Sequence, residues 1–486
     1  MSPRCVGAFG VTVSSNGCAE RWSPRISRKC VNKASTGGNH ERVQRVVEGL
    51  PKKTLNRLAR KTGFIRRQGK LSAYEFAVLM TVGHLSLKHP SLAAMVQALE
   101  AKLSREGLHQ RFTPQAVQFM QACLNETLRQ KLTPPDPLDP GVLRPFRRVL
   151  IFDSSNWDVD PRLHRVLPGA GGNASNANCK LQAGYEYKRG ELGFFHLTPG
   201  TRPDQAHSAT LPAEVMPGDL VLTDLGFFRV GTFSQYHQKG AFFLSRFLLG
   251  TTLSDAETGD VIDLPARLRA SRENTLDLHV IMANTHKEQT PCRLICLRVS
   301  EQVANERRRK LRQKAKKQGR TPKQAALALC DWILLVTNIP APWLPAAQAY
   351  CLYGLRWQIE LLFKQLKSVL RIHQSNTGRE ARLRCELYGK LLMAVLVHRV
   401  HAVLQNKLWN TERREVSFDK LHKRFQERAF LLLRQFLRSL ATALRFLQKN
   451  IPRLLKACWK AHQPSRLTTL QRLDLLLPPP FPAPLP

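Results

Sequence analysis

Residues 353–367 read YGLRWQIELLFKQLK, and the spacing of this segment is typical of an amphipathic helix. At about 100° per residue, one face carries four polar side chains within about 60° of one another: Tyr353, Arg356, Glu360 and Lys367. The opposite face carries the apolar side chains Ile359, Leu362, Phe363 and Leu366. We therefore predict a helix that buries its apolar stripe and presents a polar row about 21 Å long.

Two aspartates upstream each follow a short apolar run. Val149–Phe152 reads as a strand before Asp153, and Leu220–Thr223 reads as a strand before Asp224. A strand end is a rigid support at the edge of a sheet, and two such ends on neighbouring strands would bring both carboxylates together. Helix caps or loop acids are the alternative interpretation, and i,i+4 ion pairing on a solvated surface is the alternative for the 353–367 face.

Strand and helix signals divide the chain into an α/β pattern. Prolines between 134 and 140 predict a linker, after which strands are expected at 181–198, as a pair joined around Arg189 and Gly190, and at 241–245. Alternating residues at 276–282, 292–299 and 332–337 predict a β-rich insertion over 247–340. Helices are expected from 345 to about 475.

A dense basic segment lies inside the predicted insertion. Residues 307–323 hold ten Lys or Arg in seventeen positions and begin with Arg307, Arg308, Arg309 and Lys310. Such a segment is too charged for a core, so we predict a loop or an exposed helix. Its charges either are simply solvated or contact phosphates.

The region 43–130 shows helix signals. Ser72 with Glu75 forms a predicted capping box, Ser91 is a predicted N-cap, and Thr113 with Pro114 predicts a third helix start. Short helices with basic outer faces, including the segment Lys102–Arg111, suit a DNA-docking domain of the helix-turn-helix type. A helical packing domain with solvated charges is the alternative.

The charge balance favours a polyanionic partner. Lys and Arg number 75 against 36 Asp and Glu, for a net charge of +39. The longest apolar run, Leu391–Val397, is far shorter than the roughly 20 residues that span a bilayer, so nucleic acid is favoured over a membrane. The 11 cysteines show no repeated C-x2-C pair, and Cys292 and Cys296 are expected to pack in the core. We expect a reduced, cytoplasmic protein without an export signal.

Three motifs together resemble a known family. Tyr353, Arg356, Glu360 and Lys367 spell Y-x2-R-x3-E-x6-K, which resembles the signature of the insertion-sequence-four family of bacterial transposases. Asp224-Leu225-Gly226-Phe227 resembles the family's second motif. Asp153-Ser154-Ser155 departs from the first motif, where a Gly commonly follows the Asp, so Asp158 and Asp160 remain alternatives to Asp153.

This resemblance covers roughly residues 50–470 and implies a ribonuclease-H-like catalytic domain interrupted by a β-strand insertion before the Glu. Together with the pattern above, it predicts a division of the chain that reads as follows: 1–42, disordered leader; 43–140, helical DNA-binding domain; 141–246, catalytic core, first part; 247–340, β-rich insertion; 341–405, catalytic core, second part; 406–475, basic helical C-terminal region; 476–486, proline-rich tail.

The resemblance also implies an activity. Asp153, Asp224 and Glu360 would be catalytic carboxylates and metal ligands of a cut-and-paste DNA transposase. Three carboxylates in one site repel one another unless cations lie between them, and two Mg²⁺ ions, with Mn²⁺ able to substitute, meet that need. Tyr353, Arg356 and Lys367, with Arg307, Arg308, Arg309 and Lys310, would contact DNA.

The implied partners are the element's terminal inverted repeats and target DNA, bound by a homodimer in a bacterial cytoplasm, with nucleoid association when DNA is bound. A hairpin step is implied by the resemblance alone. Two alternatives use the same residues: a ribonuclease-H-like nuclease that does not join strands, and a DNA-binding relic whose catalysis has been lost.

Overall fold

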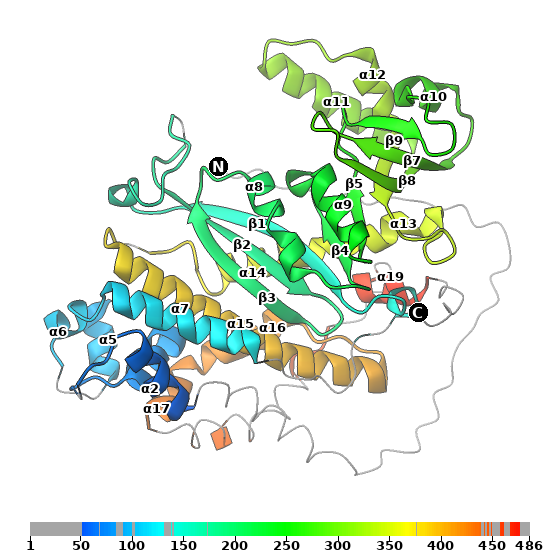
Figure 1. Cartoon of the computed structure of the whole chain (residues 1–486). Coiled ribbons are helices and arrows are strands. Elements are labelled where there is room, and N and C mark those ends of the chain that lie inside the picture. Colours follow the sequence, from blue (N-terminus) through cyan, green and yellow to red (C-terminus); the bar gives the residue numbers. More distant parts are fainter. Residues whose placement is uncertain are drawn as a thin grey trace, which may run out of the picture.

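The computed structural model describes residues 51–476 except for 68, 84–90, 100–102, 131–137, 139, 173, 376, 439–441, 443–444, 447–448, 450–456 and 461–466. The predicted leader, most of the proline linker and the proline-rich tail lie outside the described residues. The described part is a mixed α/β structure built on one nine-stranded sheet, as predicted in outline (Figure 1).

The strand order in this sheet is β3-β2-β1-β4-β5-β9-β8-β7-β6. β1, β4 and β5 are parallel, and every other neighbouring pair is antiparallel. The strands have these bounds: β1 Val149–Asp158, β2 Asn178–Glu186, β3 Glu191–Pro199, β4 Leu220–Thr223, β5 Phe242–Arg246, β6 Thr252–Asp255, β7 Thr275–Ala283, β8 Gln289–Arg298 and β9 Trp332–Thr337.

One predicted strand end is wrong in detail. β1 does not end before Asp153, because its antiparallel pairing with β2 continues to Asp158. Its parallel pairing with β4 does end there, with Phe152 opposite Thr223 as the last pair. The outcome for the sheet edge is the one expected, since Asp153 and Asp224 are the next residues on the two strands.

The predicted β-rich insertion is an extension of the sheet. β9 pairs with β5 of the first sheet half, and β8, β7 and β6 follow outward. Residues 307–317 of the basic segment are helical, and an exposed helix was one of the two predicted forms. This part of the molecule carries three helices on its outer side (Figure 1): α10 Leu264–Ala270, α11 Glu301–Lys317 and α12 Gln324–Ala328.

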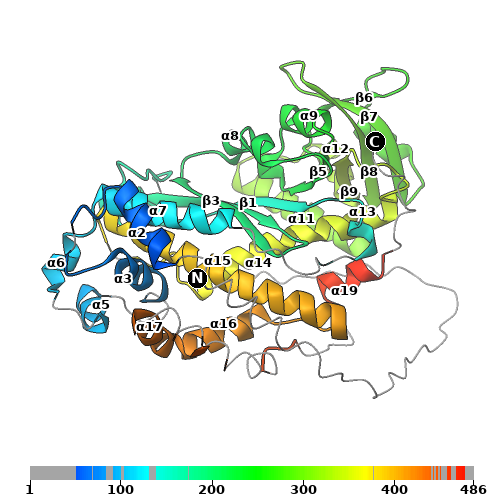
Figure 2. The ribbon, with the colours of Figure 1, turned by 60° about the horizontal axis from the view of Figure 1, so that its bottom comes forward.

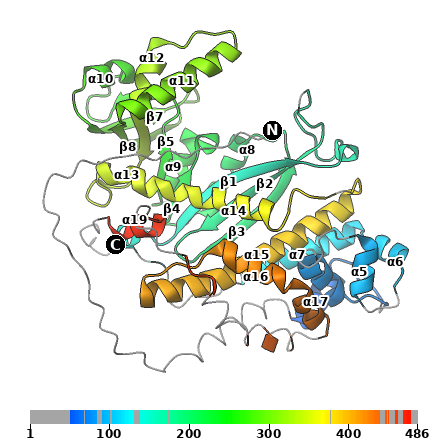
Figure 3. The ribbon, with the colours of Figure 1, turned by 180° about the vertical axis from the view of Figure 1, so that it is seen from behind.

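The polar row predicted on a single helix over 353–367 lies on two helices. α13 (Ala346–Tyr353) and α14 (Trp357–Ser368) are separated by a 3₁₀ turn over Gly354–Arg356. Arg356 still contacts both sides of this turn, since its guanidinium lies over the ring of Tyr353 and bonds Glu360. α14 crosses the sheet over β1 (Figure 3).

The long helix α15 (Glu380–Glu412) joins the N-terminal and C-terminal parts of the fold. It lies beside α7 (Pro114–Arg129) under β3, and both views of this region agree on the arrangement (Figures 1 and 2). The predicted division at 405/406 falls within α15. Gly389 of α15 is needed for close packing, because a Cβ there would lie 2.1 Å from the carbonyl oxygen of Met80.

α15 is also long and apolar enough to cross a membrane by length and composition. Within the structure, 89% of its most apolar window is buried, which is typical of the core helix of a globular fold.

The remaining helices begin largely where the sequence predicted. Ser72 forms the capping box with Glu75, Ser91 caps the next helix, and Thr113 with Pro114 begins α7. Tyr74 donates to the carbonyl of Phe436, so the N-terminal helices pack against the C-terminal region.

The helices not yet described have these bounds: α2 Lys52–Lys61, α3 Ala73–Val78, α5 Leu92–Ala98, α6 Arg105–His109, α8 Asp204–Ser208, α9 Val230–Gln238, α16 Phe418–Glu427, α17 Ala429–Arg438 and α19 Thr469–Asp474.

Candidate catalytic site

Asp153 and Asp224 lie on the same face of the sheet. Side chains alternate along a strand, so each aspartate shares a face with the residue two positions earlier. Those residues, Ile151 and Leu222, belong to one core cluster, which also contains Ile359 of α14. The two aspartates therefore emerge at the sheet edge on the face that α14 covers.

α14 brings Glu360 to this edge. Its buried residues Ile359, Leu362, Phe363 and Leu366 seat the helix on the sheet. Arg356, just before α14, donates to Glu360 and also donates to Asp153 with an Nη1–Oδ2 distance of 3.5 Å. One guanidinium thus links carboxylates from β1 and α14. This contact joins two segments that lie 203 residues apart in the sequence.

Electrostatic effects connect all three carboxylates. Burial raises the pKa of Asp153 to about 7, the negative charges of Asp224 and Glu360 add to that rise, and Arg356 opposes it. Burial acts to lower the pKa of Arg356, but Tyr353, Asp224 and Glu360 outweigh it and the net shift is upward. The three acids and one arginine therefore form a single charge cluster.

The donor chemistry of this cluster fits a hard divalent cation, because such cations take carboxylate oxygens as ligands. Among the residues that the structure describes, no three His, Cys, Asp or Glu side chains lie close enough together to hold a metal ion. The guanidinium of Arg356 instead supplies positive charge between Asp153 and Glu360. A cation that bound these carboxylates would compete with Arg356.

Tyr353 is buried, with 6% of its surface exposed, and its hydroxyl donates to the carbonyl of Thr223 at 3.3 Å. Thr223 directly precedes Asp224, so Tyr353 fixes the backbone from which that aspartate extends. Lys367 is half-buried and donates to the carbonyl of Asn156 on β1 at 3.0 Å. Both side chains therefore join α13 or α14 to the sheet in this structure.

The four basic residues predicted to contact DNA in the insertion have different surroundings. Arg307 donates to the carbonyl of Trp332 at 3.0 Å, and Arg308 pairs with Asp331. Arg309 and Lys310 both pair with Glu306, at 2.8 and 3.3 Å, on the exposed side of α11. The two exposed residues are open to a ligand, whereas the first two also hold the insertion together.

The alternatives to Asp153 lie away from the cluster. Asp158 is exposed at the far end of β1, where its carboxylate accepts from Asn178 at 2.9 Å. Asp160 pairs with Arg162 at 2.7 Å. No contact with Arg356 or Glu360 is recorded for Asp158 or Asp160 in the described part of the chain.

Sequence reasoning missed Asp204, the first residue of α8. Its carboxylate accepts from Ser154 at 2.8 Å, from Gln182 at 2.9 Å and from Lys180 at 3.3 Å. Gly226 lies next to it, since a Cβ there would be 3.5 Å from Oδ2 of Asp204. Asp204 therefore touches the residue after Asp153 and the second residue after Asp224. No motif distinguishes it from other acids, so only the fold reveals it.

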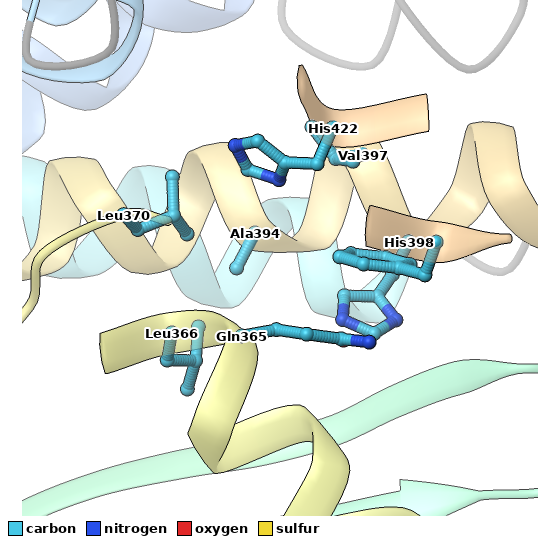
Figure 4. A pocket seen from close by; sticks show the side chains of 8 residues that line it. Gln365, Leu366, Leu370, Ala394, Val397, His398 and His422 are labelled. Atoms are coloured by element: carbon cyan, nitrogen blue, oxygen red, sulfur yellow. The ribbon is translucent and has the colours of Figure 1, made fainter. Parts of the chain in front are cut away.

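A separate cavity lies between α14, α15 and α16, away from the carboxylates. Its lining mixes apolar side chains with two histidines, His398 and His422 (Figure 4). Both ring nitrogens of His422 are buried without a hydrogen-bond partner in the described structure. Cys292 and Cys296, which the sequence predicted to pack, lie in the core on β8.

The chain is similar to known proteins over most of its length. A family model described as a transposase DDE domain matches residues 144–396. The chain is 27% identical over 442 residues to the transposase for insertion sequence element IS231E of Bacillus thuringiensis subsp. finitimus, covering 87% of this chain and 92% of that one. It is 26% identical over 394 residues to the transposase for insertion sequence element IS1151 of Clostridium perfringens, covering 76% and 83%. A cryo-EM structure of a piggyBac transposase synaptic complex with hairpin DNA gives a TM-score of 0.46 at 12% identity, covering 87% of this chain and 86% of that one.

Proposed function

This chain belongs to the transposase DDE domain family, and on that basis we propose that it is a DNA transposase that cleaves the ends of an insertion sequence and joins them to target DNA. Its relatives over most of the chain are transposases of insertion sequence elements. Family membership was expected from the Y-x2-R-x3-E-x6-K spacing and is confirmed.

One observation carries the assignment of the site. Arg356 bonds Glu360 from its own helical segment and Asp153 from a strand 203 residues away. A solvated row of surface charges needs no such long-range partner. We propose Asp153, Asp224 and Glu360 as the catalytic carboxylates because they form one charge cluster at the edge of the parallel strands.

The strand order supports a ribonuclease-H-like catalytic domain. β3, β2 and β1 are antiparallel neighbours, and β4 and β5 then continue from β1 as parallel strands. We assign residues 141–246 and 341–405 to this domain and 247–340 to the insertion. The insertion begins after β5 and returns through β9 beside it, so it enlarges the sheet without separating Glu360 from the aspartates.

We propose that the three carboxylates would hold two divalent cations, with Mg²⁺ as the expected ion and Mn²⁺ as a substitute. When bound, such ions activate an attacking water or 3′-hydroxyl and stabilise the departing oxygen. Asp153 must lose its proton to serve as a ligand, and its raised pKa makes that loss dependent on a nearby positive charge. Arg356 supplies this charge in the structure at hand.

We propose DNA as the partner of the basic surfaces. Arg356 contacts two of the carboxylates, and Lys367 reaches β1 at Asn156, three residues beyond Asp153. Both would hold phosphates near the cleavage point, the first by a forked contact and the second as a point charge. In the insertion, Arg309 and Lys310 are exposed and would contact phosphate from the surface, while Arg307 would contact it from a position fixed by the carbonyl of Trp332. Arg308 is paired with Asp331. Tyr353 would act as a brace for Asp224 through Thr223.

The N-terminal helices carry exposed basic residues and are proposed as the part that recognises the element's ends. Arg57, Arg60 and Arg66 are exposed on or just after α2. These helices pack on α15 and α17, so the DNA-docking unit would be fixed to the catalytic part. A homodimer in which each subunit binds one end, and a bacterial cytoplasmic location, complete the proposal.

The direct test incubates the purified protein with duplexes that carry the element's own ends, with Mg²⁺ or with EDTA. Metal-dependent nicking at the end, absent on a scrambled duplex, is the expected result. A second substrate with a pre-cleaved 3′ end then separates transposase from nuclease, because only a transposase joins it to target DNA. Binding without nicking in any metal would support the relic interpretation instead.

A further inference from the structure

Arg246 ends β5 at the same level of the sheet as the proposed catalytic aspartates. Parallel pairing sets Thr223 opposite Ser245, so the residues that follow them, Asp224 and Arg246, reach the sheet edge together. Asp153 reaches the same edge on the neighbouring strand. With strands about 4.8 Å apart, the backbone of Arg246 lies about 5 Å from that of Asp224 and about 10 Å from that of Asp153.

Arg246 also points to the face on which the carboxylates lie. Leu244, two residues earlier, belongs to the core cluster that contains α14. Arg246 pairs with Leu335 of β9, which belongs to the same cluster. Because side chains alternate along each strand, Arg246 shares the face of Asp153 and Asp224.

The guanidinium of Arg246 is available to a ligand. Its side chain is exposed, and in the part of the chain that the structure describes it forms no hydrogen bond or ion pair. By contrast, Arg356 is bonded to two carboxylates and Lys367 to a carbonyl. Within the described part of the chain, Arg246 therefore has free donors at the sheet edge where Asp224 stands.

A second arginine is anchored on β9, the strand that pairs with the end of β5. Trp332, whose carbonyl accepts from Arg307, stands three residues before Leu335, the β9 partner of Arg246. Arg307 of α11 is held by the carbonyls of Cys330 and Trp332. Burial lowers the pKa of Arg307, the positive charge of Arg246 lowers it further, and no carboxylate contributes to the shift. Two arginines that reach the same junction of the sheet can bind one anion with several acceptor oxygens.

We propose that Arg246 and Arg307 form a phosphate-binding pair at the junction of the catalytic sheet and the insertion, which holds the DNA backbone phosphate next to the one that is cleaved. This inference rests on the proposed function, because it takes DNA as the ligand. The guanidinium of Arg246 is free beside Asp224, whereas that of Arg307 is held in place by backbone carbonyls of the insertion. A phosphodiester offers two non-bridging oxygens that share one negative charge, one oxygen for each guanidinium.

Arg246→Ala tests the pair in binding measurements made in EDTA, where cleavage plays no part. Because Arg246 is exposed, its removal leaves the packed contacts intact. We expect affinity for an end-bearing duplex to fall about tenfold or more. The slope of log affinity against log salt should fall by up to about 0.9 for the one lost contact. Arg272→Ala, at an exposed arginine in the insertion and away from β5, is the matched control and should change both quantities less.

Single methylphosphonate substitutions, which remove the charge of one phosphate, locate the contact. In the wild-type protein, one substitution beside the scissile phosphate should weaken binding, and in Arg246→Ala the same substitution should have a clearly smaller effect, because only the contact of Arg307 is left to lose. If every substitution weakens the variant as much as the wild type, the pair is not a phosphate site. Cleavage of the unmodified duplex by the wild-type protein in Mg²⁺ is measured separately. If the wild type does not cleave, the proposed function fails, whatever the binding measurements show.

Discussion

Arg356 and Asp153 are joined by an ion pair of 3.5 Å across 203 residues of sequence, and the same guanidinium is bonded to Glu360. Side-chain exposures of 15% for Arg356 and 17% for Asp153 keep this contact largely out of water. The positive charge of Arg356 therefore balances the negative charges of Asp153 and Glu360. A divalent ion must compete with Arg356 for the same carboxylate oxygens.

Arg356→Ala should consequently make the stability of the folded protein depend on divalent metal ions. Without the guanidinium, the carboxylates are left half-buried and unpaired, and we expect the free energy of unfolding in EDTA to fall by about 2 kcal/mol. Mg²⁺ or Mn²⁺ should restore part of that loss and raise the melting temperature more than in the wild type. Arg384→Ala, which breaks an Arg–Glu pair on α15, is the control and should show no metal-dependent recovery. Equal metal effects in all three proteins would refute the competition.

Asp204 is predicted to position the catalytic strands. It accepts hydrogen bonds from Ser154, next to Asp153, and from Gln182 on β2. Asp204→Ala should slow cleavage about tenfold or more at saturating DNA, because small displacements of reacting groups are costly, while DNA affinity stays close to wild type. Ser154→Ala removes one of these bonds and should give a smaller effect in the same direction. A loss confined to affinity would assign Asp204 to DNA binding instead.

Tyr353→Phe separates a structural role from DNA contact. The buried hydroxyl donates to the carbonyl of Thr223, so its loss should cost about 1 kcal/mol of stability and leave the salt dependence of DNA binding unchanged. Chemical denaturation and a salt titration of binding measure the two effects. A lower salt slope without a stability change would show that the hydroxyl contacts phosphate, as the motif alone suggested.

The helix pattern illustrates what the sequence can and cannot predict. Apolar spacing predicted that Ile359, Leu362 and Leu366 would be buried, and they are. The same spacing could not predict the 3₁₀ turn at Gly354–Arg356, because local winding depends on how α13 and α14 both fit the sheet. Tyr353 was therefore placed on an exposed face when it is in fact buried.

Contacts between residues far apart in the chain are the second feature that the sequence could not predict. Strand patterns predicted where Asp153 and Asp224 stand, since apolar runs of four residues are readable from the chain. The pairing of β5 with β9 brings together residues some 90 positions apart, such as Leu244 and Thr337, and it places Arg246 beside the strand whose residue Trp332 holds Arg307. Asp204 was missed for the same reason, because its partners come from β1 and β2.

His422 should make the protein acid-sensitive. Burial lowers the pKa of His422 to about 4, below the ordinary value of 6.5, so the folded chain binds fewer protons than the unfolded chain between these values. Its contribution to stability is present above about pH 6.5 and is lost as pH falls toward 4. In His422→Leu, the unfolding free energy should therefore fall less between pH 7 and pH 4, by about 3 kcal/mol relative to wild type. His279→Leu, at an exposed histidine, should show no such difference.

The central claim is that Asp153, Asp224 and Glu360 perform the chemistry. The most direct measurement is Mg²⁺-dependent cleavage of an end-bearing duplex by Asp153→Asn, Asp224→Asn and Glu360→Gln, with binding to the same duplex measured in parallel. Each variant should lose cleavage and keep most of its affinity, because metal ligands are removed but the basic surface is not. Asp158→Asn, five residues along the same strand, should cleave as the wild type does. Retained cleavage in Glu360→Gln would contradict the account.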